Sequence, residues 1–426
     1  MAGRFMLLGS LIYALIFLGL VTVNGGPLAL TLPLLIYLGA ALMQHTSEVR
    51  MTAVRTLSRD SVLQNEPISI QLQVTNEGSD LEEVLIEDRL PEGLELLDGQ
   101  NSTICSLPSG MSLVLDYTVR GPRGNYNFET VKITASDHLG VMRQVVDAPA
   151  KSSLTYLPET MRLTRVAIRP ARTHGHSGPI PSGKSGAGVD FYGLREYQMG
   201  DPRRWINWRA SARHQQDLFV NQFEQERIAD VGLILDARQQ ADIVLPDGKS
   251  LFEYSVQATA ALAEAFLNDG NRVGLLVYGF GLHRTFPGYG KVQHERIMQA
   301  LGQARTGHNF ALESLRYLPT RFFPAGSQLV MISPLLSSDI TAITRLRASG
   351  YDILVVSPDP VDFEAQHLGV KDEPAYRLAC IERSLLLHRV QRLGVRLLDW
   401  PVSQPFAPLV RARLSRAPAA QRVVNL

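Results

Sequence analysis

Residues 178–185, "GPIPSGKS", satisfy the phosphate-binding loop pattern G-x-x-x-x-G-K-[ST], in which Lys184 would contact a nucleotide. Such a loop holds phosphate through consecutive backbone N–H groups in front of a helix N-terminus. Two of its four variable positions are Pro179 and Pro181, which have no N–H to donate. No core strand precedes the pattern, and the following "GAGV" is a poor helix start. We therefore expect a flexible loop, and a nucleotide hydrolase is the weakest of three functional hypotheses.

Other reactive side chains are scattered. His174 and His176 have a spacing that could bind a metal, but no further ligand lies near them in the sequence. Cys105 and Cys380 are far apart and form neither a disulfide framework nor a metal-ligand cluster. We find no zinc-protease motif, serine elbow or paired catalytic acids. The sequence predicts no catalytic residue, no enzymatic activity and no cofactor.

The densest unusual stretch is "GLREYQMGDPRRWINWRASARHQQDLFVNQFEQE", residues 193–226. Asp201 before Pro202 predicts a helix start, with an N-cap followed by proline at the first helical position. Trp205 and Trp208 would share one face of that helix, and Glu196 and Asp201 would be natural partners for nearby arginines. Such a segment either locks onto a sheet or forms a docking surface for a protein. Glu224 and Glu226, in place of further basic residues, argue against nucleic-acid binding.

These residues closely resemble the signature R-E-Y-x-x-G-D-x-x-R-x-I-x-W-x-x-S-A-R of the membrane proteins called domain of unknown function 58. The matching positions are Arg195, Glu196, Tyr197, Gly200, Asp201, Arg204, Ile206, Trp208, Ser211, Ala212 and Arg213. The resemblance covers roughly residues 190–270 and implies a von Willebrand factor A-like domain. It also implies a MoxR-type AAA+ ATPase as partner and a role in assembling or activating other complexes.

Domains of the implied class often bind Mg²⁺ or Mn²⁺ through Asp-x-Ser-x-Ser after the first strand, with a threonine and an aspartate from later loops. Hard cations of this kind need oxygen ligands. Asp236 fills the first position, but Arg238 and Gln240 replace the serines, and Ser333-Pro334 follows the strand expected to precede the later carboxylate. Thr306 could stand for the threonine. We therefore expect a degenerate site, with Asp236 paired to an arginine, and keep a metal-dependent adhesion or recognition domain as the second hypothesis.

The N-terminus contains two uncharged runs, residues 5–23 and 27–43, separated by Asn24-Gly25-Gly26. The first would form a helix about 28 Å long, close to the thickness of a bilayer core. A cleaved signal peptide is the alternative for the first run, although cleavage would leave a second apolar run that still needs a membrane. Arg4 before the runs and arginines after them place both ends in the cytoplasm. We predict a multi-pass inner-membrane protein that contacts lipid through residues 5–43.

The remainder divides into further regions. Strict alternation such as Ile68, Ile70, Leu72 and Val74 predicts a small antiparallel, immunoglobulin-like β-sandwich. Alternating strand and helix patterns from about residue 191 predict a mostly parallel, Rossmann-like sheet covered by helices. The apolar run 231–235 predicts a core strand, and Ser250 with Glu253 forms a capping box that opens a helix. The predicted regions are a transmembrane hairpin at 1–46, the β-sandwich at 51–155, a linker or flexible loop at 156–190, the von Willebrand factor A-like α/β domain at 191–402 and a basic tail at 403–426.

Basic and acidic residues nearly cancel, at 42 against 41, so no strong field attracts nucleic acid. The first hypothesis is therefore a membrane-anchored, non-enzymatic adaptor that presents its α/β domain to a protein partner. Ligands of open parallel sheets bind at the carboxyl ends of the strands. The loops after Leu235, Tyr278, Ile332 and Val356 are the expected binding face.

Overall fold

The computed structural model describes residues 2–43, 49–136, 143–164, 166–168, 180–213, 217–312, 314–319, 322–368 and 374–415. The chain divides into two compact units, Met1–Leu157 and Pro158–Leu426. His174 and His176, considered above as metal ligands, lie outside the described residues, as does the end of the basic tail from residue 416.

The N-terminal residues form two helices, α1 (Ala2–Val21) and α2 (Gly25–Met43), which pack against each other. Within the described ranges, no helix is both long enough and apolar enough to cross a membrane. The predicted spanning hairpin and the multi-pass inner-membrane location are therefore wrong. The predicted lipid contact of residues 5–43 stays a prediction. The uncharged run of residues 5–23 extends past the end of the helix that forms there. α1 ends at Val21, and Val23 turns the chain with a φ of 47°.

Two sheets form the rest of the first unit. Their strands are β1 (Met51–Leu57), β2 (Ser61–Leu63), β3 (Ile68–Asn76), β4 (Leu81–Asp88), β5 (Glu95–Gly99), β6 (Ser102–Leu107), β7 (Ser112–Arg120), β8 (Gly124–Ser136) and β9 (Arg143–Leu157). One sheet has the order β1-β3-β7-β5 and the other β2-β9-β8-β4-β6. Ile68 pairs with Val119, and Leu72 with Leu115. Alternate residues of β3 are buried, so the period of two in the sequence builds the core between the strands.

A buried polar network lies within this core. Arg55 on β1 forms hydrogen bonds of 3.0 and 2.5 Å with the carboxylate of Asp88 on β4 and donates another to the carbonyl of Ala150 on β9. The hydroxyl of Tyr117 on β7 donates to Asp88 over 2.6 Å. Burial, followed by the charge of Asp88, raises the pKa of Tyr117 well above its ordinary value. Because every member has a partner, the network ties strands of both sheets together without leaving a reactive group.

The second unit contains a six-stranded sheet of order β14-β13-β12-β15-β16-β17. Its strands are β12 (Asp230–Ala237), β13 (Arg272–Gly279), β14 (Leu282–Gly288), β15 (Gln328–Ile332), β16 (Asp352–Pro358) and β17 (Arg396–Trp400). Only the edge strand β14 runs antiparallel to its neighbour within this sheet. All residues of β12 are buried, as expected for a central strand covered on both faces.

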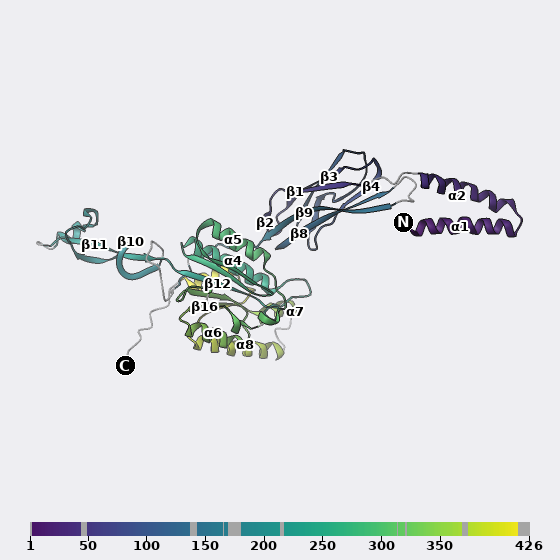
Figure 1. The fold of residues 1–426 in the computed structure, drawn as a ribbon. Coiled ribbons are helices and arrows are strands. Elements are labelled where there is room, and N and C mark those ends of the chain that lie inside the picture. The colour runs from purple at the N-terminus through teal and green to yellow at the C-terminus, as the bar shows by residue number, and fades with distance from the viewer. Residues whose placement is uncertain are drawn as a thin grey trace. The chain divides into compact units, whose positions relative to one another are not determined.

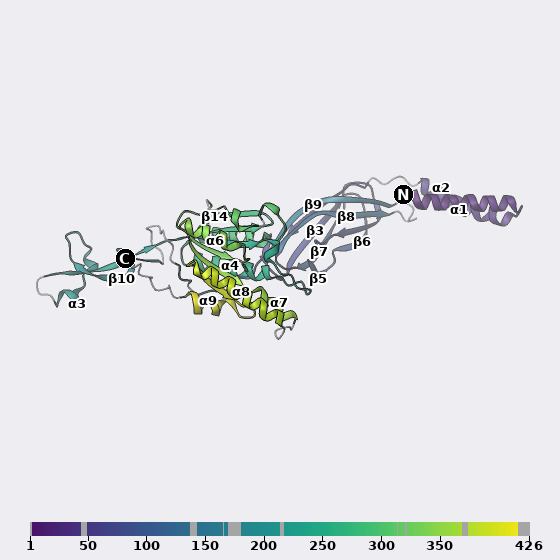
Figure 2. The same ribbon diagram turned by 90° about the horizontal axis from the view of Figure 1, so that it is seen from below.

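Helices cover both faces of this sheet. They are α4 (Leu251–Asn268), α5 (Gly290–Gln303), α6 (Asp339–Ala348), α7 (Pro360–Leu368), α8 (Pro374–Arg392) and α9 (Phe406–Leu414). Figure 1 shows α4 and α5 on one face and α6 and α8 on the other, and α9 packs beside β17 (Figure 2). The α4 start agrees with the sequence pattern, because the Ser250 hydroxyl accepts a hydrogen bond of 3.1 Å from the Phe252 N–H.

A separate two-stranded sheet precedes the six-stranded one. It consists of β10 (Ile180–Glu196) and β11 (Phe219–Arg227), and we call these strands with the residues between them the signature hairpin. β10 begins inside the segment expected to be a loop. Residues 184 and 185 lie in this strand, which continues to Glu196. The strand–loop–helix scaffold of a phosphate-binding loop is therefore not formed at the GKS pattern.

The fold class predicted from the sequence is wrong. It required a membrane-spanning hairpin, which is not found in the described residues. It also assigned the signature to one von Willebrand factor A-like domain, whereas strands are spread over four sheets and the signature lies on a sheet of its own. Hydrophobic periodicity identifies strands, but sheet membership depends on pairings between distant segments that the period does not encode.

Candidate functional site

The signature hairpin is organised around an ion pair between Arg195 and Asp201. The two guanidinium nitrogens donate to the two carboxylate oxygens over 2.7 and 2.6 Å. Asp201 also accepts 2.9 Å from the Gln198 N–H, and Arg195 donates 2.9 Å to the Glu196 carbonyl. The Arg195 hydrogen bonds, followed by that of Gln198, lower the pKa of Asp201. This bidentate pair fixes the turn that leaves β10.

Gly200 makes that turn possible. Its φ is 114°, which residues with a side chain rarely adopt, and no heavy atom lies within 4 Å of the position a Cβ would take. The requirement is therefore for backbone freedom rather than space. The expected pairing of Asp201 with an arginine is confirmed. The expectation that Asp201 also caps a helix is wrong, because its carboxylate is engaged by Arg195 and Gln198.

Asn207 is the helix cap in this segment. Its side-chain oxygen accepts from the Ala210 N–H over 2.9 Å, which starts the single turn α3 (Trp208–Ser211). The Ser211 hydroxyl donates to the Asn207 carbonyl and accepts from the Phe219 N–H, both over 2.9 Å. Ser211 is thereby buried and joins α3 to the start of β11. Sequence reasoning missed Asn207, although an asparagine before a tryptophan–arginine–alanine run is a recognisable cap.

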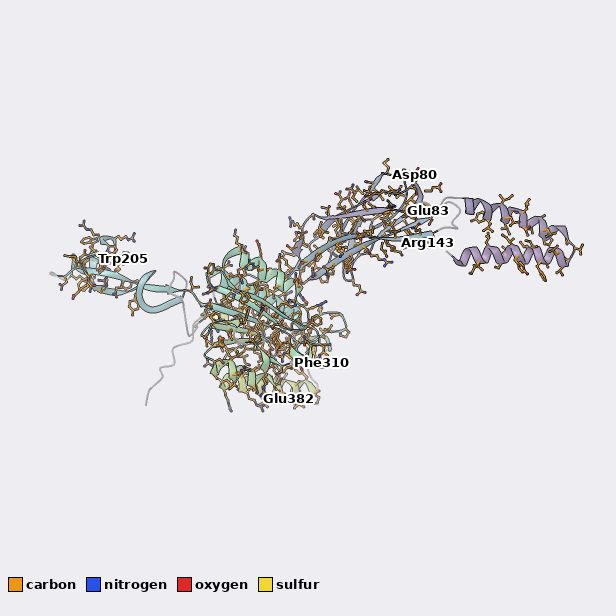
Figure 3. All side chains as sticks on the ribbon, viewed as in Figure 1. Asp80, Glu83, Arg143, Trp205, Phe310 and Glu382 are labelled. Carbon is orange, nitrogen blue, oxygen red and sulfur yellow. The ribbon has the colours of Figure 1, made fainter. Side chains whose placement is uncertain are left out.

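The two tryptophans do not share a helix face as predicted. Trp205 ends a short 3-10 turn, η1 (Arg203–Trp205), and the extended Ile206 separates it from Trp208 at the start of α3. Ile206 makes an isolated β-bridge with Val220, and Val220 is buried. Trp205 is half-buried, whereas 67% of the Trp208 surface is exposed. Figure 3 marks Trp205 on the signature hairpin.

The signature thus divides into two sets. The first maintains the hairpin through side-chain contacts, a bridge or backbone geometry: Arg195, Gly200, Asp201, Ile206 and Ser211. The second is exposed: Glu196, Arg204, Trp208, Ala212 and Arg213. Tyr197 is intermediate in exposure, and its N–H bonds to the Leu218 carbonyl over 2.7 Å.

Between residues 197 and 213 the only acidic residue is Asp201, against arginines at 203, 204, 209 and 213. All four of these arginines are exposed, and none forms an ion pair with another residue whose side chain the structure describes, so this end of the hairpin presents positive charge around Trp208.

A second group of charged residues lies buried at the carboxyl ends of β12 and β15. We call Asp236, Arg238, Ser333 and Asp339 the Arg238 cluster. The Arg238 guanidinium donates to Asp236 over 2.8 and 2.7 Å and to Asp339 over 2.9 and 2.8 Å. The Ser333 hydroxyl donates to Asp236 over 2.7 Å. Burial alone would lower the pKa of Arg238, but the two carboxylates outweigh it and raise this pKa.

The candidate metal ligands Asp236 and Thr306 have other partners in the structure. Asp236 binds an arginine, and the Thr306 hydroxyl donates to Asp242 over 3.1 Å instead of reaching Asp236. Among the residues with described placement, no three His, Cys, Asp or Glu side chains gather as a metal site. The carboxylate oxygens of Asp236 therefore bind a guanidinium, and the residues present do not fit a divalent cation.

Asp339 is the carboxylate that the sequence reading missed. The expected position followed β15 directly, where Ser333 and Pro334 stand, but the carboxylate comes from the first residue of α6. An aspartate after serine at the start of a helical pattern is a helix-start signal, and it could have drawn attention to this residue. Its contact with Arg238 spans 101 positions and could not be read from the sequence.

A second arginine closes the neighbouring loops. Arg383 on α8 lies 3.0 Å from Asp359, which follows β16, and 2.6 Å from Asp399 on β17. It also donates to the Pro334 carbonyl over 3.3 Å. Three of the four loops expected as a binding face, those after Leu235, Ile332 and Val356, are thus held by buried arginines.

The loop after β13 differs. Phe280 in this loop is 42% exposed, and the Arg305 guanidinium lies 4.7 Å from its ring centre. Phe310, which begins the 3-10 turn η3 (Phe310–Leu312) after α5, is 84% exposed. Phe310 is marked in Figure 3. A pocket of about 50 Å³ beside them is lined by Arg238, Gln239, Gln240, Gly279, Gly307, His308, Asn309 and Leu312.

Comparison with known proteins identifies the segment that carries the signature. Residues 193–372 match the family described as "Protein of unknown function DUF58". This segment belongs to the DUF58 family. The DUF58 segment includes most of the signature hairpin, the Arg238 cluster and α4 to α7, so the resemblance inferred from the signature residues is confirmed.

A relative supports the same assignment. The uncharacterized protein YeaD of Bacillus subtilis (strain 168) is 30% identical over 200 residues, which cover 46% of this chain and 48% of that protein. The chain thus spans about half the length of the curated relative that it matches.

Similar solved structures include a FixG-related protein from Vibrio parahaemolyticus and a CARDB domain from Pyrococcus furiosus. The first is 10% identical, with a TM-score of 0.18, and the match covers 25% of this chain and 95% of that one. The second is 15% identical, with a TM-score of 0.18, and covers 25% and 93%.

Proposed function

We propose that this protein is a non-enzymatic adaptor that binds a protein partner through the exposed residues of the signature hairpin. We further propose that the partner is a MoxR-type AAA+ ATPase and that the pair assembles or activates other complexes. The match to the DUF58 family supports binding through the hairpin only in that it covers the signature residues. The proposed partner class rests on the resemblance of those residues to the family signature.

The exposure of Trp208 is the observation that carries the proposal. Tryptophan and arginine are the residues most enriched among those that dominate binding energy at protein interfaces. Trp208 is 67% exposed, yet it begins a helical turn whose cap, Asn207, and last residue, Ser211, are both fixed by hydrogen bonds. Because the backbone of this turn is already fixed, a partner that covers Trp208 has only the side chain to order, which lowers the entropic cost of binding.

The charge around Trp208 indicates the chemistry of the partner surface. Asp201 is neutralised by Arg195, whereas Arg204 and Arg213 are exposed. Arginine binds carboxylates through two parallel hydrogen bonds, as the pair within this hairpin does. We therefore expect an acidic surface on the partner with a hydrophobic recess for the indole.

The test is direct binding between the full chain and a MoxR-type ATPase encoded in the same genome, measured by biolayer interferometry. Trp208→Ala should weaken binding by at least about 2 kcal/mol, the size typical of a dominant interface residue. Phe310→Ala is the matched control, because it removes another exposed aromatic side chain from the carboxyl edge of the six-stranded sheet.

Each outcome is informative. Loss of binding in Trp208→Ala with normal binding in Phe310→Ala supports the hairpin. The reverse result transfers the binding site to the 3-10 turn that begins at Phe310. No binding by the unmodified chain would refute the ATPase as partner.

A further inference from the structure

We infer that the Arg238 guanidinium is an internal cation that takes the place of a divalent metal ion at the carboxyl edge of the six-stranded sheet. Its ligands would form a metal site if the arginine were removed. The inference is independent of the proposed adaptor function, because it concerns a different part of the DUF58 segment.

The first observation is the convergence of oxygen atoms on one nitrogen. The Nη2 atom of Arg238 lies 2.7 Å from Asp236 Oδ2 and 2.8 Å from Asp339 Oδ2. The Ser333 hydroxyl is 2.7 Å from the same oxygen of Asp236. Two carboxylates and a hydroxyl from three separate segments are the kind of hard oxygen ligands that Mg²⁺ and Mn²⁺ bind. In this chain the two carboxylates hold a guanidinium instead, and the hydroxyl bonds to one of them.

The second observation is the balance of charge. The side chains of Asp236, Arg238 and Asp339 are at most 2% exposed, and two carboxylates face one guanidinium. Removing the arginine would leave two buried negative charges without a counter-ion, which is strongly unfavourable. A divalent cation would neutralise both charges, whereas the arginine neutralises one.

The third observation is a route for an ion. Arg238 forms part of the wall of the pocket of about 50 Å³ at this edge. Shortening its side chain would join the pocket to the two carboxylates. Gly279 and Gly307 also form the pocket wall, where a Cβ atom would collide with the backbone of Ala237 and with the ring of Phe280.

The experiment compares the full-length chain with Arg238→Ser, using Mn²⁺ alone as the probe in titration calorimetry and electron paramagnetic resonance. We expect saturable binding of one Mn²⁺ by Arg238→Ser and none by the unmodified chain. In Arg238→Ser combined with Asp339→Asn, affinity should fall by more than about tenfold, since even outer-shell partners of a metal contribute about 10–100-fold. A folded Arg238→Ser that binds no Mn²⁺ would overturn the inference, as would equal binding by the unmodified chain.

A second pair of variants keeps the test decisive if Arg238→Ser does not fold. Arg238→Lys retains a positive charge, whereas Arg238→Gln retains N–H donors without charge. If the guanidinium acts as a cation, Arg238→Lys should have the higher melting temperature of the two. Equal melting temperatures, or a higher one for Arg238→Gln, would show that hydrogen bonding and not charge is required, which would contradict the inference.

Discussion

Arg238 and Asp339 are 101 residues apart in the chain, yet the guanidinium of one donates two hydrogen bonds, of 2.9 and 2.8 Å, to the carboxylate of the other. This pair joins the end of β12 to the first turn of α6. Asp339 also accepts 2.9 Å from the Leu336 N–H, so the loop between β15 and α6 is held as well. Backbone geometry at this edge therefore depends on a charge cluster buried from solvent.

Arg238→Met should destabilise the second unit by about 3–5 kcal/mol, because it leaves two buried carboxylates without their shared partner. Asp339→Asn should cost less, about 1–3 kcal/mol, since Asp236 still pairs with Arg238. The measurement is urea unfolding followed by tryptophan fluorescence, because Trp205, Trp208 and Trp400 all lie in this unit. The control is Lys249→Met, which breaks an ion pair with Asp247 in which the lysine side chain is 59% exposed. It should lower the free energy of unfolding by about 1 kcal/mol or less. A cost of the same size for Arg238→Met would contradict the prediction.

The signature hairpin should lose its clamp at acidic pH. Because hydrogen bonds from Arg195 and Gln198 lower the pKa of Asp201, its stabilising effect is complete above the ordinary aspartate pKa of about 3.9. The effect is lost as the pH falls through the lower pKa of the folded state. Nuclear magnetic resonance of the Gln198 amide, which bonds to Asp201, reports this titration directly. Arg195→Lys should move the midpoint upward, and an unmodified midpoint near 3.9 would rule out the clamp.

Binding of the ATPase should depend on salt through the exposed arginines. Arg204→Glu and Arg213→Glu should each slow association at low ionic strength, and the difference from the unmodified chain should shrink at high ionic strength. Stability should change by no more than about 0.5 kcal/mol, since both side chains are exposed. Association rates at several salt concentrations provide the measurement. Rates that are unaffected by either charge reversal would exclude an acidic partner surface.

In the first unit, Tyr117→Phe should destabilise the two packed sheets by about 1.5–3 kcal/mol, because its hydroxyl donates to the buried charged Asp88 over 2.6 Å. Tyr126→Phe is a matched control, since its hydroxyl donates over 3.0 Å to the neutral carbonyl of Pro122. That change should cost about 0.5–1.5 kcal/mol. Chemical unfolding followed by far-ultraviolet circular dichroism compares the two variants, and equal costs would show that the charge of Asp88 adds nothing.

Local patterns were read well wherever one short segment sets its own structure. Alternation in residues 68–74 predicted β3, the apolar run 231–235 predicted a buried strand, and Ser250 predicted the start of α4. Misreadings arose where a residue had two possible partners. Asp201 next to Pro202 has the pattern of a cap, but Arg195 across the turn binds it more strongly through two charged hydrogen bonds.

The sequence by itself determined the family of residues 193–372 and the positions of strands and helices whose hydrophobic period is strong. It also indicated that Asp236 would pair with an arginine. Only the tertiary structure decided that Asp339 completes the Arg238 cluster and that Trp208 is exposed while Ser211 is buried. The physical reason is that period and propensity act over neighbouring residues, whereas a buried charge requires a counter-charge that chain folding can bring from any distance.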